Sequence, residues 1–169
     1  FLSVEGNRIR VHGTAWMDHE FGSNQLGKEQ TGWDWFSIQL SNNTELMLYL
    51  MRNKSGSYDF TSSGSLIGSD GSVRHLSLTD FTVKNRSFWK SEKSKALYPI
   101  HWEIEIPKYK LKLNIKALNN EQELDTSKST QIIYWEGGII VEGFSHGIRV
   151  NGVGFVEMTG YAKYGRPKF

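Results

Sequence analysis

The chain has 169 residues, 38% of them hydrophobic, which is the size of a single domain with one core. Its 20 Lys and Arg residues against 18 Asp and Glu residues give a net charge of +2, and the basic residues are scattered, which argues against nucleic acid as the main partner. The absence of cysteine excludes disulfides and thiolate metal sites, and no apolar run is long enough for a transmembrane segment.

Alternation of apolar and polar side chains with a period of two recurs along the chain, and helical periodicity is nearly absent. The 13% aromatic residues, 17 Gly and 3 Pro also fit an all-β protein with many tight turns. In chain order, the predicted strands are Arg8–Trp16, Trp33–Leu40, Glu45–Arg52, Tyr58–Ile67, Val73–Leu76, Phe81–Val83, Ile100–Ile106, Lys110–Leu118, Gln131–Glu142 and Ile148–Tyr161.

Turn-forming residues separate these strands. Ser41–Thr44 predicts a hairpin turn, because Asn tolerates a positive φ, and Gly143–Gly147 joins the last two strands. We expect Phe88–Tyr98 to be a polar connection and Asn119–Ser129 a loop. About nine or ten strands with short connections predict one antiparallel β-barrel over residues 1–169, with a two-sheet sandwich as the alternative.

Residues 13–34 hold the densest group of side chains able to transfer a proton. In an extended strand Trp16, Asp18 and Glu20 share one side, while His19 points to the other. Two carboxyl groups beside an indole predict an acid that keeps its proton inside a cavity, because desolvation and like charge both oppose ionisation. The alternative is structural: Asp18 and His19 cap the strand end and Glu20 lies in solvent.

A second candidate is the face of the next strand that alternates with its aliphatic side chains. The hairpin register places Tyr49 opposite this face, which consists of Trp33, Trp35, Ser37 and Gln39. We expect it to line the barrel interior, where tryptophan walls and a few polar groups would bind a large apolar ligand. An ordinary packed core is the alternative.

Glu136 and Glu157 lie in otherwise apolar strands, where an unpaired charge is costly. Each therefore needs a wet cavity or a partner such as Arg149 or Lys163, and the neighbouring glycines predict bulges or close strand approach. The five histidines share no ligand spacing, so no metal site is predicted. The residues expected to contact a ligand are Trp16, Trp33, Trp35, Gln39, Trp102, Trp135, Glu136, Glu157 and Tyr161.

Several motifs, in order, resemble one known family. They cover the chain from about Gly13 to Tyr161 and read AWMDHEFG, GWDWFSIQL, ELMLYLMR, DGS, YPIHWEIEIP, YWEGG and GVGFVEMTGY. The chain is similar to the lipocalin-like group that contains the AttH proteins, the carotenoid 1,2-hydratases (hydroxyneurosporene synthases) and kievitone hydratase. The resemblance implies a lipocalin-like, calycin-type barrel that is the C-terminal one of two, with an N-terminal sister barrel as partner. It also implies a periplasmic or secreted location.

The resemblance also implies a reaction and its residues. In the hydratases catalysis is attributed to an Asp-His-x-aromatic segment, here Asp18, His19 and Phe21, and to a nearby Tyr and Asp, of which the Tyr corresponds to Tyr49. This chain departs from the hydratase pattern in two ways. The hydratase version of the segment has Trp at the position of Phe21, and no carboxylate lies close to Tyr49 in the sequence.

The function expected from this resemblance is binding of an apolar small molecule, a terpenoid, polyketide or lipid. Acid-catalysed addition of water to a carbon–carbon double bond would need no cofactor: Asp18 or Glu20 would supply the proton and His19 would orient the acid or activate water. The indole faces would stabilise the carbocation. The alternatives are a non-catalytic accessory module associated with an export system, and a pericyclase-type pocket that folds a reactive polyene.

Overall fold

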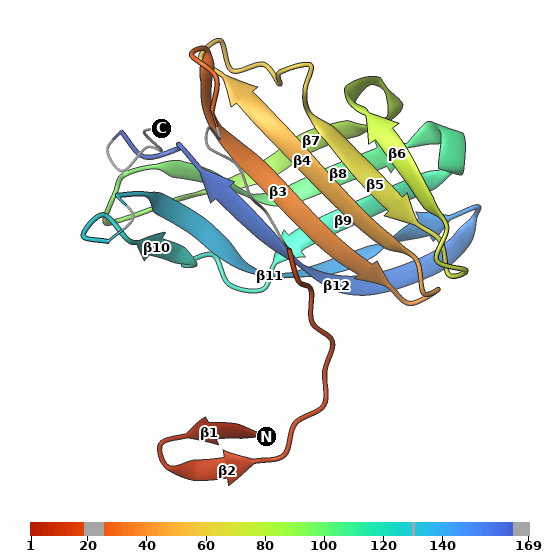
Figure 1. Ribbon diagram of the computed structural model, residues 1–169, viewed down its shortest axis with the longest axis horizontal. Helices are drawn as coiled ribbons and strands as arrows, with labels where there is room; N and C mark the ends of the chain where they lie inside the picture. Colours follow the sequence, from red (N-terminus) through yellow and green to blue (C-terminus); the bar gives the residue numbers. More distant parts are fainter. Residues whose placement is uncertain (19–25, 130, 164–169) are drawn as a thin grey trace.

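The computed structural model describes residues 1–18, 26–129 and 131–163, and Figure 1 shows them as a curled antiparallel sheet with an N-terminal arm. The strands are β1 (Leu2–Val4), β2 (Asn7–Ile9), β3 (Gln30–Leu40), β4 (Glu45–Asn53), β5 (Ser63–Ile67), β6 (Val73–Ser77), β7 (Thr82–Lys90), β8 (Leu97–Ile106), β9 (Leu111–Ala117), β10 (Glu123–Asp125), β11 (Ile133–Ser145) and β12 (Ile148–Thr159). Two short 3-10 helices, η1 (Leu78–Asp80) and η2 (Pro107–Tyr109), connect strands.

One sheet of ten strands contains every strand of the described residues except β1 and β2. Its order is β6-β5-β4-β3-β12-β11-β9-β8-β7, with β10 paired to β11. Neighbours in sequence are mostly neighbours in space, and the pairing of β12 with β3 brings the last long strand beside the first. The prediction of an antiparallel, lipocalin-like barrel of nine or ten strands is confirmed, as a half-barrel whose sheet ends at β6 and β7 in the described part of the chain.

The predicted turns contain residues that adopt a positive φ. Asn43 adopts a φ of 59° in the β3–β4 hairpin, and His146 and Gly147 adopt 52° and 83° between β11 and β12. Gly154 of β12 also shows the close approach expected of the glycines, because a Cβ there would overlap the carbonyl oxygen of Ser37 on β3.

Strand alternation gives the sheet an apolar inner face. Phe36 of β3, Trp102 of β8 and Trp135 of β11 are fully buried there, with the Trp102 ring 5.6 Å from Phe36 and 6.1 Å from Trp135 between centroids. β9 shows the same pattern, because its buried leucines and isoleucine alternate with exposed lysines and asparagine. These side chains belong to one continuous core.

Several predicted boundaries are wrong. β5 begins only at Ser63 and not at Tyr58, and β11 continues to Ser145, into the expected turn Gly143–Gly147. β7 continues to Lys90 and β8 begins at Leu97, so the expected polar connection is mostly strand. Pro99 is tolerated inside β8 because it lies opposite Phe88, where the β7–β8 register shifts and the ladder is already irregular. A short strand, β10, also forms within the expected loop 119–129.

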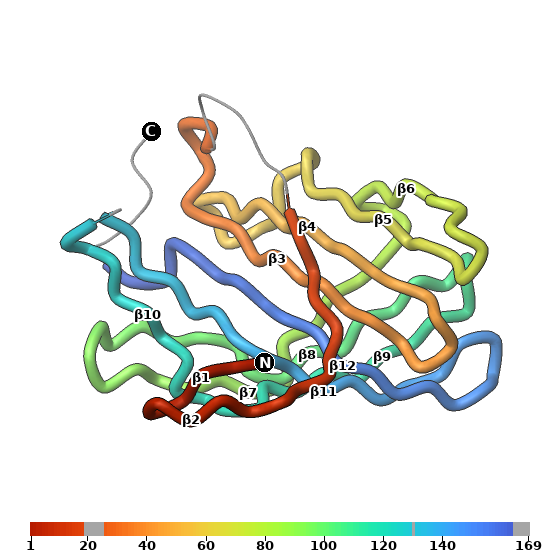
Figure 2. Tube along the Cα trace, turned by 60° about the horizontal axis from the view of Figure 1, so that its bottom comes forward, coloured from red at the N-terminus to blue at the C-terminus, as the bar shows by residue number. Residues whose placement is uncertain are grey.

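The predicted strand Arg8–Trp16 is also wrong. β2 ends at Ile9 and pairs only with β1, while residues 10–18, which we call the strap, have no strand partner. Figure 1 shows the β1–β2 hairpin standing away from the barrel, and Figure 2 shows the strap running across its outside. Residues 8–16 have the apolar–polar alternation of a strand, but a β-strand also requires hydrogen bonds to a neighbouring strand. No helix in the described residues is both long and apolar enough to cross a membrane.

Candidate functional site

A cavity of about 450 Å³ lies between the strap and the outer face of β3 and β12. A smaller hollow of about 220 Å³ adjoins it and adds Trp33 and Tyr49 to the lining. We call the two together the outer pocket; it is lined by Thr14, Ala15, Trp16, Asp18, Trp33, Trp35, Ser37, Gln39, Tyr49, Val153, Gly154, Phe155 and Glu157. Its size falls in the range typical of sites for small molecules.

The alternation of β3 builds one wall of the outer pocket. Phe36 and Ile38 are fully buried on the inner face, so Trp35 and Ser37, which alternate with them, point outward. The prediction that this tryptophan face lines the barrel interior is therefore wrong. Strand alternation shows which side chains share a face but not which face is buried. The face with Phe36 and Ile38 has no polar side chain between them, so its burial removes more apolar surface from water, and it faces the interior.

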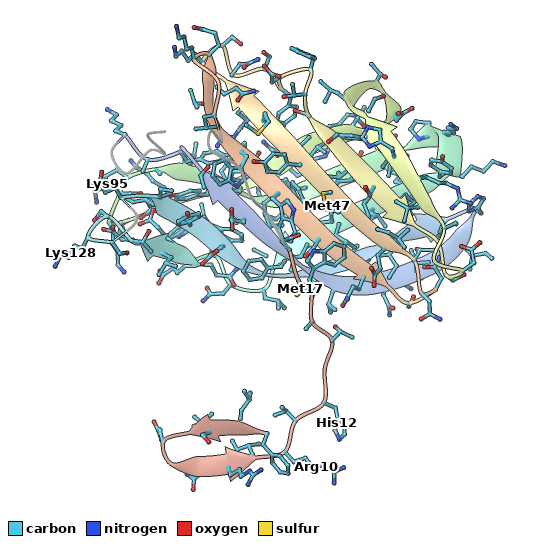
Figure 3. The ribbon with its side chains drawn as sticks, viewed as in Figure 1. Arg10, His12, Met17, Met47, Lys95 and Lys128 are labelled. Atoms are coloured by element: carbon cyan, nitrogen blue, oxygen red, sulfur yellow. The ribbon has the colours of Figure 1, made fainter. Side chains whose placement is uncertain are left out.

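The strap forms the opposite wall. The Trp16 ring lies edge-on to Trp35, with centroids 6.2 Å apart and planes at 74°. Trp16 Nε1 donates to Asp18 Oδ1 at 3.1 Å, so the two side chains share one side of the strap as predicted. Gln39 Nε2 donates to the Ala15 carbonyl at 3.5 Å. Figure 3 shows Arg10 and His12 on the part of the strap away from the barrel and Met17 where the strap reaches it.

A row of four side chains crosses the outer face of the sheet. Glu136 on β11 lies opposite Glu157 on β12, which lies opposite Trp35 on β3 and then Tyr49 on β4. Trp33 Nε1 donates to Glu157 Oε1 at 2.7 Å, and its ring lies 6.3 Å from that of Tyr49. Burial raises the pKa of the Glu136 carboxyl above its ordinary value. The row places two carboxyl groups side by side next to aromatic walls.

The structure brings seven of the predicted site residues together in the outer pocket, and Glu136 beside them: Asp18, Tyr49, Trp16, Trp33, Trp35, Gln39 and Glu157. Trp102 and Trp135 instead belong to the core, where Trp135 Nε1 donates to the Asn120 carbonyl at 2.8 Å. His19, Glu20 and Phe21 lie outside the described residues. Arg149 approaches Glu142 at 3.7 Å, so its expected pairing with the buried-strand glutamates is wrong.

Tyr161 belongs to a buried ionic cluster that the sequence did not predict. Arg52 Nε lies 2.9 Å from Asp34 Oδ1, the Tyr161 hydroxyl donates to Asp34 Oδ2 at 3.1 Å, and the Arg52 guanidinium lies 3.8 Å from the centre of the Tyr161 ring. Burial raises the pKa of Tyr161 well above its ordinary value, and the Asp34 charge adds to this. Burial alone would lower the pKa of Arg52, but Asp34 reverses this and raises it.

This ionic cluster ties together the strands that carry the outer pocket. Arg52 of β4 pairs with Asp34 of β3 and also donates to the Thr159 carbonyl of β12. The Thr159 hydroxyl accepts from the Trp33 amide at 3.2 Å. One sequence signal could have revealed the cluster. Asp34 alternates along β3 in step with Phe36 and Ile38, so its charged side chain was to be expected on the inner face of the sheet, where it needs a partner.

In the described residues, no group of three or more His, Cys, Asp or Glu side chains could hold a metal ion. The outer pocket offers aromatic faces for binding and carboxyl groups for proton transfer.

The comparison with family models identifies one family. A model described as AttH-like matches residues 1–161. No curated protein matches the chain. Among solved structures, the chain is similar to an AttH protein from Nitrosomonas europaea, with a TM-score of 0.73 and 28% identity over 83% of this chain and 42% of that one. It is also similar in fold to kievitone hydratase from Nectria haematococca, with a TM-score of 0.63 and 21% identity over 79% of this chain and 40% of that one. The chain thus spans about two fifths of the length of these proteins.

Proposed function

The chain belongs to the AttH-like family, and from this premise we propose that its outer pocket binds an apolar small molecule of the terpenoid, polyketide or lipid class. One observation carries the proposal: a cavity of about 450 Å³ whose walls include Trp16, Trp35 and Phe155, next to polar side chains that include Ser37 and Gln39. Aromatic walls supply large apolar contact, and the polar groups fix the orientation of a bound molecule.

The polar groups of the outer pocket support this function. Ser37 and Gln39 point into it from β3, and each offers a hydrogen bond that an apolar ligand with one hydroxyl or carbonyl group would use. Phe155 and Val153 from β12 extend the apolar wall on the other side. Both remain partly exposed, Val153 at 51% and Phe155 at 38%, so a ligand would remove apolar surface from water.

A paired substitution tests where the ligand binds. Val153 lines the outer pocket, and its cross-strand neighbour Ile140, 44% exposed, does not. We expect Val153→Trp to fill the cavity and weaken binding of N-phenyl-1-naphthylamine, a neutral apolar fluorescent dye, about 10-fold or more, which a fluorescence titration measures. Ile140→Trp should leave affinity within about twofold, because the added ring lies outside the pocket. Failure of the unmodified protein to bind the dye, or equal effects of the two variants, would overturn the proposal.

A second candidate function, addition of water to a carbon–carbon double bond, is favoured by the Glu136–Glu157 pair. The two residues are cross-strand neighbours, and burial raises the pKa of Glu136, which favours the protonated form of that carboxyl group. Glu157 lines the outer pocket beside it and would deliver a proton to an alkene carbon, with the faces of Trp33 and Trp35 beside the resulting cation. This replaces Asp18 and Glu20 by Glu157 as the proposed acid.

A further inference from the structure

Another cavity lies at the end of the barrel where four connections meet. The β3–β4, β5–β6 and β11–β12 turns and η2 gather at this end, toward the right of Figure 1. Between them is a cavity of about 190 Å³, which we call the end pocket; its lining includes Leu66, Arg74, Tyr109, Leu111, Ser145 and His146. It shares no described lining residue with the outer pocket, so the two are separate sites.

The strand pairing places a polar side chain beside each of two buried leucines in the end pocket. Leu66 of β5 lies opposite Arg74 of β6, and Leu111 of β9 lies opposite Ser145 of β11. Directly opposed residues project from the same face of a sheet, here the inner one, because both leucines belong to the core. The end pocket is thus a mouth of the barrel with an apolar floor and a polar rim.

The charged side chains on this rim are basic. The described residues that line the end pocket include Arg74 and His146 and no Asp or Glu. Both side chains are exposed at the surface, so a ligand can reach them from solvent.

The contacts of Arg74 leave its charge available to a ligand. Its Nη1 donates to the Ser72 hydroxyl at 3.1 Å, and its guanidinium lies 5.8 Å from the centre of the Tyr109 ring; both partners are neutral. Asp70 lies on the same turn, but the pKa of its carboxyl group is lowered mainly by hydrogen bonds from Ser72 and only to a smaller extent by the charge of Arg74. No Asp or Glu of the described residues forms an ion pair with Arg74.

His146 brings a second donor to the end pocket from a different turn. It adopts a φ of 52°, and its amide donates to the Lys110 carbonyl at 3.0 Å, which ties the β11–β12 turn to the start of β9. Its Nδ1 lies 3.4 Å from the Ser145 hydroxyl oxygen. An imidazole has an N–H to donate in its neutral and in its charged form. A guanidinium and an imidazole above an apolar floor suit the oxygens of a carboxylate.

We propose that the end pocket binds a small carboxylate with an apolar body, of the size of an aryl or short branched-chain acid. The carboxylate lies against the Arg74 guanidinium with His146 as the second donor, and the apolar body covers Leu66 and Leu111. The volume of about 190 Å³, well below the 450 Å³ of the main cavity of the outer pocket, limits the ligand to this size. This second site goes beyond the proposed function of the outer pocket and does not depend on it.

Three probes of the same shape test the sign of the charge. Benzoate, benzamide and benzamidine share a phenyl ring and are anionic, neutral and cationic at neutral pH. In ¹H–¹⁵N NMR titrations, benzoate should shift the amide signals of Arg74, Tyr109 and His146. We expect it to bind about fivefold or more tightly than benzamide, and benzamidine to bind the most weakly. Added salt should reduce this preference, because the cations are exposed.

Matched variants assign the preference to the end pocket. Arg74→Gln removes the charge of an exposed side chain, so the protein should stay folded, bind benzoate about as weakly as benzamide and bind benzamide as before. His146→Asn places a residue that tolerates the positive φ and should weaken benzoate binding several-fold. Arg86→Gln, on β7 and outside the end pocket, should leave the affinity for benzoate within about twofold.

Three results would overturn this inference. They are equal binding of benzoate and benzamide, unchanged affinity for benzoate in Arg74→Gln, and benzoate-induced shifts at the outer pocket instead of the end pocket. Binding of N-phenyl-1-naphthylamine is a separate result, because its failure would count against the function of the outer pocket alone.

Discussion

Replacing Arg52 with alanine should cost about 3–5 kcal/mol of unfolding free energy, the largest loss expected for any single side chain discussed above. The reason is the charge left behind: the side chain of Asp34 is 2% exposed, and Arg52 is its ion-pair partner at 2.9 Å. The same substitution also removes the bond to the Thr159 carbonyl, so β3, β4 and β12 lose a shared contact. Guanidinium unfolding followed by tryptophan fluorescence measures the loss.

Arg86 provides the matched control. It pairs with Glu103 at the same distance, 2.9 Å, but its side chain is 46% exposed, so Arg86→Ala should cost less than about 1 kcal/mol. Equal losses in the two variants would show that the buried ion pair does not hold these strands.

The loss in Arg52→Ala should depend on pH. Burial raises the pKa of Asp34, and without Arg52, which opposes this, the pKa rises further. A group whose pKa is raised by folding stabilises the fold below its ordinary pKa, and that stability is lost as pH rises through the raised value. The variant should therefore approach the stability of the unmodified protein toward pH 4, and Asp34→Asn in the same background should recover part of the loss at pH 7.

Replacing Glu157 with glutamine should lower the rate of the proposed hydration about 100-fold or more. In the proposed reaction the Glu157 carboxyl group gives its proton to one alkene carbon, and the cation forms at the neighbouring carbon beside the indole faces. Water then bonds to that carbon and returns a proton to the carboxylate. The net change is the addition of one water molecule, and no electrons are gained or lost.

The assay uses β-farnesene, a neutral C15 isoprenoid, in ¹⁸O-labelled water, with mass spectrometry of the labelled alcohol. Glu157→Gln should bind N-phenyl-1-naphthylamine within about threefold of the unmodified protein, so that loss of turnover is separated from loss of binding. Glu142→Gln should keep full activity because it lies outside the pocket.

Two results would contradict the hydratase account. Undiminished turnover by Glu157→Gln would assign the proton to another group. Dye binding without any labelled alcohol from the unmodified protein would favour the non-catalytic accessory module.

The sequence predicted the barrel because strand alternation and turn residues are local signals. The β3–β4 hairpin illustrates this: Asn42–Asn43 set the turn, and the turn set the register that pairs Trp35 with Tyr49. Alternation in residues 8–16 misled for the same reason, since a local pattern does not show whether a partner strand exists.

The sequence grouped most of the candidate site but placed it on the wrong side of the sheet. Strand alternation placed Trp33, Trp35 and Gln39 on one face of β3. Which of the two faces is buried inside the barrel depends on how all the strands pack together. The Glu136–Glu157 pair depends on the β11–β12 register, and the Asp34–Tyr161 contact joins positions 127 residues apart. Contacts of this kind follow from tertiary packing and not from spacing.

The tryptophan side chains offer the most direct test of the location of the site. The indole N–H signals of the six tryptophans can be assigned by single Trp→Phe substitutions and followed by ¹H–¹⁵N NMR as N-phenyl-1-naphthylamine is added. Binding in the outer pocket predicts that the signals of Trp16, Trp33 and Trp35 shift while those of the core residues Trp102 and Trp135 do not. Shifts confined to Trp102 and Trp135 would place the ligand inside the barrel and contradict the account.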